Sequence, residues 1–182
     1  MHRCLVFLVI ISVSSGTLLT NGDFEQPFTT GWQQASSGSY VVIDRATSYD
    51  PDPDHEARCE KGDGTGFACL YQTVDVPSTN LIFSCIAKVY AYDNHPTAWC
   101  GAAVRIFYMN AASTKLGETM ICMRSTQNPW NDTSTRHLII ASDSLWHTYT
   151  FNVDNELTNL PGVDPSQIAK MQIALYDTCY DC

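Results

Sequence analysis

The sequence is poor in basic residues. It has 10 Lys and Arg residues against 19 Asp and Glu residues, and its formal net charge is −9 at pH 7. Nucleic acids and anionic membrane surfaces both bind proteins through a basic surface. We therefore expect neither as a partner. An acidic surface suits solubility and cation binding, but it does not by itself identify a ligand.

Motifs that carry catalysis are also missing. The sequence has no G-x-S-x-G, no H-E-x-x-H and no P-loop. Its histidines lie on predicted loops or strands without an evident Ser, Cys or Asp companion. These absences predict a protein that is not an enzyme and that has no catalytic residues.

Helical periodicity is absent as well. No window places apolar residues at i, i+3, i+4 and i+7 over three turns, and the best stretch, 164–170, covers only about one turn. The sequence has no internal repeat, no low-complexity tract and no linker. A single all-β domain is the interpretation that fits these observations.

One long apolar run stands at the start of the chain. Cys4 to Val13 is apolar, Met1-His2-Arg3 precedes it, and Ser14-Ser15-Gly16 follows it. Such a run is too short to cross a hydrocarbon layer about 30 Å thick. The pattern predicts a secretory signal peptide over residues 1–16, cleaved after Gly16. A buried N-terminal strand, the alternative, does not account for these flanks.

The remaining residues, 17–182, are long enough for one domain with a full hydrophobic core. We expect this domain to be secreted and extracellular, with no membrane insertion. Loss of Arg3 with the leader lowers the net charge from −9 to −10.

Short strand patterns separated by turn signals fill this domain. They are 18–20, 23–25, 40–44, 68–76, 81–92, 102–110, 118–123, 137–140, 146–153 and 170–176. The stretch 45–66 is rich in Asp, Pro and Gly and predicts a long loop. Strands at these spacings are typical of a two-sheet antiparallel β-sandwich.

Alternation along the two longest strands predicts which side chains face the core. In 81–92 the residues in phase with Phe83 are almost all apolar, whereas Tyr90 and Tyr92 belong to the mixed, wet side. In 102–110 Val104, Ile106 and Tyr108 face inward, and Arg105 and Phe107 face outward.

Cysteine is abundant but odd in number. The chain has 8 cysteines, and removal of Cys4 with the leader leaves seven. An oxidising compartment favours disulfides, and an odd count leaves at least one thiol without an internal partner. Cys85 lies on an apolar face and suits a buried thiol. The disulfide candidates are Cys59 with Cys69 around a Gly-rich turn, Cys100 with Cys122 on neighbouring strands, and Cys179 and Cys182 in a C-x-x-C.

The sequence patterns that could indicate a metal site are weak. The C-x-x-C has no accompanying H-x₃₋₅-H for zinc and no βαβ setting for redox chemistry. Asp50, Asp52 and Asp54 lie close together, and carboxylate oxygens are the ligands that calcium prefers. The intervening prolines keep this run extended, however, so a solvated acidic loop is the alternative.

Five segments, in order, resemble a known family. They are Leu19-Thr20-Asn21-Gly22-Asp23-Phe24-Glu25 with Gly31-Trp32, Leu70 to Pro77 with the strand ending in Lys88-Val89-Tyr90, Val104 to Tyr108 with Lys115-Leu116-Gly117, Trp146 to Phe151, and Asp164 to Ile168. This arrangement is similar to that of the jelly-roll carbohydrate-binding modules found beside cellulases and xylanases. The resemblance implies a β-sandwich whose concave face or loop rim binds a polysaccharide.

The resemblance also implies details at both ends of the domain. Many family members hold a structural calcium ion with an N-terminal acidic residue, matched here by Glu25, and with an aspartate of a closing strand. That closing strand would begin where this sequence stops, at Cys182. The domain is therefore expected either to lack its final strand or to close differently. No cofactor is required for the implied function.

A sugar-binding site needs aromatic platforms and a few polar side chains, because sugars present flat C–H faces with a fringe of hydroxyl groups. The ligand-contact candidates are Tyr90, Tyr92, Trp99, Arg105 and Trp130. Aromatic residues are also common in strands for packing alone, and this is the expectation for Trp32, Trp146 and Tyr149. Asn131-Asp132-Thr133 is an N-glycosylation sequon if the source is a eukaryote.

The function expected from the sequence is non-catalytic binding of an extracellular polysaccharide. One alternative is an adhesion or surface-structure subunit that acts by protein–protein contacts, including self-association. Another is an accessory fragment of a secreted glycoside hydrolase.

Overall fold

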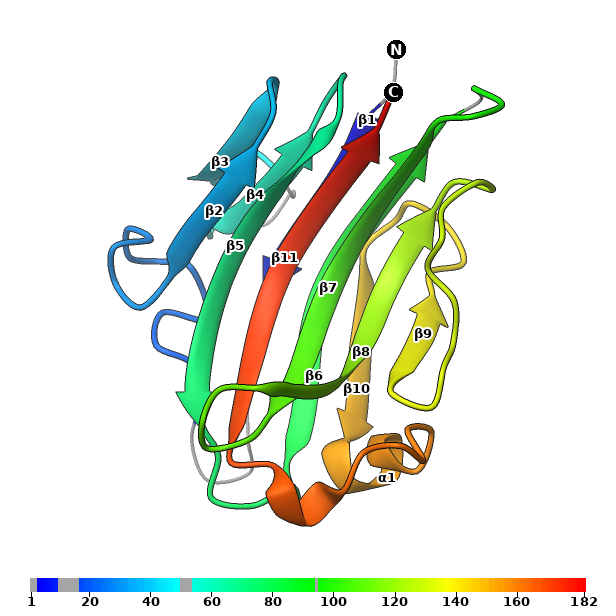
Figure 1. Ribbon diagram of the computed structural model, residues 1–182. Coiled ribbons are helices and arrows are strands. Elements are labelled where there is room, and N and C mark those ends of the chain that lie inside the picture. Colours follow the sequence, from blue (N-terminus) through cyan, green and yellow to red (C-terminus); the bar gives the residue numbers. More distant parts are fainter. Residues whose placement is uncertain (1–2, 10–16, 50–53, 94) are drawn as a thin grey trace.

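Two β-sheets pack face to face in the computed structural model, which describes residues 3–9, 17–49, 54–93 and 95–182 (Figure 1). One sheet has five strands in the order β10-β6-β1-β4-β3, and the other has six in the order β2-β5-β11-β7-β8-β9. The predicted all-β sandwich is therefore confirmed. No helix in the described ranges has the length and apolar character needed to cross a membrane.

The described residues contain the following elements, in chain order. They are β1 (Arg3–Val9), β2 (Gln33–Ser37), β3 (Val41–Ala46), β4 (Glu56–Lys61), β5 (Gly66–Asp75), β6 (Ile82–Tyr92), β7 (Trp99–Met109), β8 (Lys115–Arg124), β9 (Arg136–Ile140), β10 (His147–Asn152), α1 (Val153–Leu157), the 3₁₀ turn η1 (Pro165–Gln167) and β11 (Lys170–Tyr180).

Strand alternation builds the core as predicted. On β7, Val104, Ile106 and Tyr108 are fully buried between the sheets, while Arg105 and Phe107 lie on the opposite side of the strand. On β6 the apolar phase that contains Phe83 is buried in the same way. Burial of each large apolar side chain contributes about 1.5–3 kcal/mol, so this phase relation fixes which face of each sheet meets solvent.

Strand β11 occupies the middle of the six-stranded sheet. It pairs with β5 on one side and with β7 on the other, both antiparallel, along nearly its whole length. In this register Ala174 lies between Tyr71 of β5 and Arg105 of β7. The β8–β9 pair is parallel, so the antiparallel arrangement expected from the sequence has one exception.

Strand β1 lies inside the five-stranded sheet. It pairs antiparallel with β6 from Arg3 to Val9 and with β4 over three residues. These residues belong to the predicted leader, and in the full chain they form an N-terminal strand, the alternative that their flanking residues did not favour. Cleavage after Gly16 remains a prediction, because the structure contains the residues that cleavage would remove.

Two predicted strands are wrong. Residues 18–20 and 23–25 form turns and bends rather than strands. Asn21 organises them: its side-chain oxygen accepts the Gln26 N–H at 2.8 Å, and its carbonyl accepts the indole N–H of Trp32 at 2.9 Å. The segment is held by Phe24, which is fully buried with its ring 5.0 Å from that of Trp32.

The predicted loop 45–66 contains strand β4. Its sequence, EARCEK, does not show the usual alternation of apolar and polar residues, because one of the residues that face the core is Lys61. That lysine is almost fully buried, and its ammonium donates hydrogen bonds of 2.6–2.8 Å to the carbonyls of Gly62, Asp63 and Gly64. Local backbone carbonyls thus replace water around a charge that a hydrophobic pattern would place outside.

Candidate functional site

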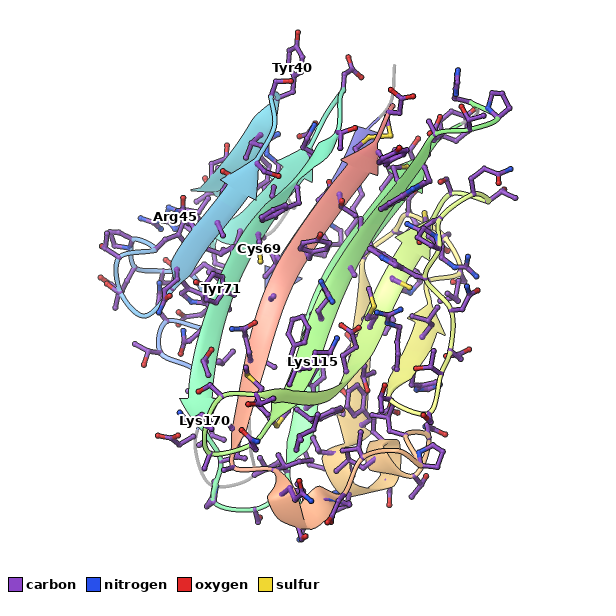
Figure 2. The ribbon with its side chains drawn as sticks, in the orientation of Figure 1. Tyr40, Arg45, Cys69, Tyr71, Lys115 and Lys170 are labelled. Atoms are coloured by element: carbon purple, nitrogen blue, oxygen red, sulfur yellow. A yellow bond between two sulfur atoms is a disulfide. The ribbon has the colours of Figure 1, made fainter. Side chains whose placement is uncertain are left out.

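The solvent-facing side of the six-stranded sheet gathers aromatic and charged side chains. We call this side the outer face; it faces the reader in Figures 1 and 2. It consists of alternate residues of β5 from Phe67 to Asp75, of β11 from Lys170 to Tyr180, of β7 from Trp99 to Met109, and of β8 from Glu118 to Arg124, with β2 and β9 at its edges.

Aromatic rings cover much of the outer face. Phe67 of β5 stacks on Tyr176 of β11, with ring centroids 5.9 Å apart. Trp99 of β7 stacks on Tyr180, also at 5.9 Å and with the ring planes 12° apart. Tyr71 stands next to this group on β5 (Figure 2). All five rings keep part of their surface exposed to solvent, so they offer flat apolar platforms to a ligand.

Trp130 joins the group from the loop after β8. Its ring centroid is 6.3 Å from that of Tyr176, and it packs with Ala103, Met120 and Leu138. The ring lies directly on β7 at Gly101, where a Cβ atom would come within 2.7 Å of it. Trp130 is only 9% exposed. It therefore covers part of the outer face at β7 and leaves little of its own ring for a ligand.

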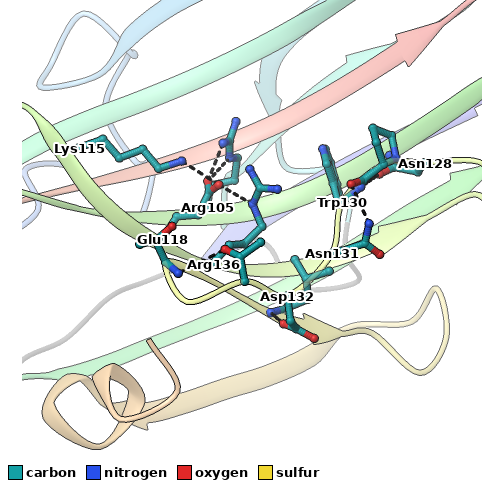
Figure 3. A network of polar contacts seen from close by, with 12 residues as sticks. Arg105, Lys115, Glu118, Asn128, Trp130, Asn131, Asp132 and Arg136 are labelled. Carbon is teal, nitrogen blue, oxygen red and sulfur yellow. Dashed lines mark hydrogen bonds and ion pairs between the residues drawn. The ribbon is translucent and has the colours of Figure 1, made fainter. Parts of the chain in front are cut away.

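Three cations surround one buried carboxylate on the same face. Glu118 is fully buried, and it binds Arg105, Lys115 and Arg136, each from a different strand or strand end (Figure 3). The Arg105 Nε and Nη2 atoms donate to Oε2, and the Arg136 Nε atom donates to Oε1 at 2.7 Å. The Lys115 ammonium lies 2.8 Å from Oε1.

This arrangement keeps Glu118 ionised. Burial alone would raise the pKa of the carboxyl group, but the charges and hydrogen bonds of Arg105, Lys115 and Arg136 outweigh it and lower the pKa to about 2. The cluster therefore holds three positive charges and one negative charge at any ordinary pH.

Aromatic rings contact two of the three cations, Arg105 and Lys115. The Arg105 guanidinium lies 4.4 Å from the Phe107 ring centroid and 4.7 Å from that of Tyr176. The Lys115 ammonium lies 4.9 Å from the Phe107 ring. Cation–π contacts of this kind orient the charged groups along the sheet surface.

The structure separates the predicted ligand-contact residues into two groups. Trp99 and Arg105 lie on the outer face, and Trp130 packs against it. Tyr90 and Tyr92 point outward from β6, which belongs to the other sheet. The five residues therefore do not share one sheet face.

Four aromatic residues of the outer face were not among the ligand-contact residues predicted from the sequence: Phe67, Tyr71, Tyr176 and Tyr180. The signal was present in β5, where Phe67 and Tyr71 alternate with the buried Ala68 and Leu70. The predicted strand 68–76 began one residue after Phe67. In β11 the predicted strand ended at Tyr176, four residues before its actual end.

The cysteines form one disulfide among the described residues, between Cys179 and Cys182. The other two candidate pairings are wrong, because the side chains face apart. Cys59 faces the core from β4, whereas Cys69 occupies an outward position on β5. Cys100 faces the core, whereas Cys122 points outward and pairs with Ala103.

Burial protects the cysteines outside the Cys179–Cys182 disulfide. Burial raises the pKa of Cys69 to about 11 and that of Cys122 to about 12. Cys59, Cys85 and Cys100 are completely or almost completely buried. Cys85 is thus the buried thiol that its apolar setting predicted.

The calcium prediction has little support in the described residues. Nowhere in 17–49, 54–93 or 95–182 do three or more His, Cys, Asp or Glu side chains lie close enough to hold a metal ion. Glu25 binds His55 instead, accepting its backbone N–H at 2.8 Å and contacting Nδ1 at 3.1 Å. Asp54 lies beside His55, and Asp50 and Asp52 fall outside the described residues.

A polar network anchors α1 to the sheets. Glu156 is buried and accepts a hydrogen bond from Thr119 Oγ1 at 2.8 Å, and His137 Nδ1 lies 2.6 Å from the same oxygen. Tyr108 contacts Thr119 at 3.0 Å. Because Thr119 lies on the core side of β8, this network has a structural role between helix and sheet.

The sequon lies at the rim of the outer face. Asn131 is exposed, follows Trp130 directly, and donates from Nδ2 to the Pro129 carbonyl at 3.1 Å (Figure 3).

Comparison with known proteins found no protein-family model that matches this chain and no curated protein with significant similarity.

Proposed function

We propose that this protein binds polysaccharide outside the cell, without catalysis, and that the outer face of the six-stranded sheet is its binding surface. The observation that carries the proposal is the set of partly exposed rings on one sheet face, Phe67, Tyr71, Trp99, Tyr176 and Tyr180.

The shape of the surface supports a chain-like ligand. The rings come from β5, β7 and β11, so they are spread across and along the sheet rather than collected in a pocket. A sugar chain can lay successive apolar C–H faces on such rings. An enclosed small molecule would need a concave pocket instead.

Polar groups lie between the rings. The Gln172 amide donates to Thr73 Oγ1 at 2.9 Å, and both side chains are on the outer face. Arg105 lies at the middle of the sheet against Tyr176. These groups can exchange hydrogen bonds with sugar hydroxyls. Such bonds would orient the sugar chain, whereas the ring contacts alone are non-specific.

The first test is loss of a platform ring. We expect Tyr71→Ala to weaken binding to a recognised polysaccharide about thirtyfold, because removal of a central aromatic contact costs about 2 kcal/mol. Titration against soluble plant and microbial polysaccharides, followed by tryptophan fluorescence and calorimetry, measures this effect. Trp99 provides the reporter on the face itself.

Tyr92→Ala is the matched control, because Tyr92 is an exposed tyrosine on β6 of the opposite sheet. Its affinity should equal that of the unchanged protein. Absence of binding to every polysaccharide would overturn the proposal and favour the protein-contact alternative. Equal losses in both variants would move the site away from the outer face.

A further inference from the structure

We infer that the polysaccharide is acidic: the cluster of Arg105, Lys115 and Arg136 around Glu118 receives a carboxylate or sulfate group of the glycan. This inference rests on the proposed function and specifies its ligand class.

Positive charge is concentrated on the outer face. Arg105, Lys115, Arg124, Arg136 and Lys170 are five of the 10 Lys and Arg residues in the chain. Against them stand two acidic residues on the outward positions of the same strands, Asp75 and Glu118. The chain as a whole carries −9. If the charged residues were spread evenly, acidic residues would outnumber basic ones on every face, so the excess of basic residues on this face is a specific feature of the fold.

The cluster is not neutralised by its own carboxylate. Glu118 lies beneath the three cations with its side chain 0% exposed, whereas those of Arg105, Arg136 and Lys115 are 17, 29 and 41% exposed. The negative charge is thus covered, and the positive charges reach solvent. A net charge of +2 faces an approaching ligand.

Donors remain available for that ligand. Among the described residues, the terminal nitrogens of Arg136 contact no acceptor, because only Nε binds Glu118. Arg105 uses Nε and Nη2 for Glu118 and has no described partner for Nη1. A guanidinium presents its free N–H groups in a plane that matches a carboxylate or a sulfate.

The donors are also fixed before binding. Arg105 is bonded to Glu118 and packed against the Phe107 and Tyr176 rings, so its rotamer is set by three contacts. A ligand that binds there pays little side-chain entropy. The same tyrosine stacks on Phe67, which joins the charged cluster to the aromatic platform. One sugar unit can therefore stack on a ring while its acidic group meets the cluster.

The test compares glycans that differ only in charge. One pair is oligogalacturonate and its fully methyl-esterified form, and the second pair is a sulfated galactan oligosaccharide before and after desulfation. Calorimetry at low and at high salt measures each affinity. We expect at least one charged member to bind about tenfold more tightly than its neutral partner, with an advantage that decreases as salt increases.

Two variants identify the cluster. Arg136→Gln and Lys115→Gln each leave Glu118 with two cations, so the fold is retained, as thermal unfolding would verify. Each should weaken binding of the charged glycan about tenfold and leave that of the neutral glycan unchanged. Lys88→Gln, on β6 of the other sheet, is the control and should change neither.

The outcomes separate this inference from the proposed function. Equal affinity for charged and neutral members overturns the acidic-ligand inference while glycan binding stands. Charge preference that persists in both cluster variants also overturns it. If no glycan of either pair and none of the wider panel binds, the proposed function fails together with the inference. The two charged ligands distinguish recognition of carboxylate from recognition of sulfate.

Discussion

Glu118 shows how one buried carboxylate organises a surface. Alone it would be costly to bury, and Arg105, Lys115 and Arg136 alone would repel one another. Together they form a network in which each cation is held at a fixed position on the sheet. The arrangement has a direct consequence for stability as a function of pH.

Because the pKa of Glu118 is lowered to about 2 in the folded protein, from an ordinary value of 4.5, the folded state binds its proton more weakly than the unfolded state. Its contribution, about 3 kcal/mol, is present above pH 4.5 and is lost as the pH falls toward 2. Urea unfolding between pH 7 and pH 2 should show this loss in the unchanged protein. Glu118→Gln should be less stable at pH 7 and should converge with it in acid.

Asp75→Asn serves as the control, since Asp75 is an exposed carboxylate on the same face. Its pH profile should follow that of the unchanged protein. A Glu118→Gln profile parallel to that of the unchanged protein down to pH 2 would contradict the assigned role.

At the scale of residues, the sequence predicted which side chains point outward but not which side chains contact one another. Alternation along 102–110 placed Arg105 outward, as the structure confirms. It could not place Glu118 or Arg136 beside it, because those contacts depend on the register of β7 with β8 and of β8 with β9. The same limit explains the wrong pairing of Cys100 with Cys122.

At the scale of elements, strands with long apolar alternation were predicted well. The ranges 81–92 and 102–110 correspond closely to β6 and β7. Strands β2 and β4 were missed, because QQASS and EARCEK carry too few apolar residues to show a period of two. Their pairing is imposed by neighbouring strands rather than by their own composition.

Strand β1 yields a prediction at this scale. A chain of residues 17–182 lacks the strand between β4 and β6, and it therefore exposes two unpaired edges and the apolar residues beneath them. We expect this shorter chain to unfold at lower denaturant concentration than the full chain and to self-associate as its concentration rises. Light scattering after gel filtration and urea titration measure both properties.

Sequencing of the N-terminus after secretion shows which form exists naturally. A secreted chain that begins at Thr17 and stays monomeric and equally stable would contradict the expectation that β1 is needed. A chain that keeps Arg3 would contradict cleavage of the predicted leader instead.

At the scale of the whole molecule, the sandwich is stabilised by packing, and the disulfide found among the described residues lies near the C-terminus. That bond joins residues only three positions apart, so it constrains little of the unfolded chain. The remaining thiols of residues 17–182 are Cys59, Cys69, Cys85, Cys100 and Cys122. A fold held mainly by its core should protect them.

We therefore expect native protein to react slowly with a thiol reagent, with Cys69, the most accessible of the five, reacting first. Denaturant should make all five available. Peptide mass mapping after alkylation identifies each modified cysteine. Rapid native reaction at Cys59 or Cys85 would show that the two sheets open readily.

The fold class was accessible from the sequence because it depends on the sum of many weak strand patterns. The proposed binding face could be predicted only in part, because it depends on which sheet each strand joins. Tyr90 and Trp99 are close in sequence, yet they point from opposite sides of the sandwich.

The low pKa of the buried Glu118 predicts how an acidic glycan would dissociate when the pH is lowered. Carboxylic acids of sugars, like other carboxyl groups, gain a proton at a pH of roughly 3 to 4, before Glu118 does. Mild acid would therefore neutralise a uronate while Glu118 and the three cations keep their charges, so the uronate would dissociate. A sulfate ester would keep its charge and stay bound. The pH of elution would thus distinguish a carboxylated glycan from a sulfated one.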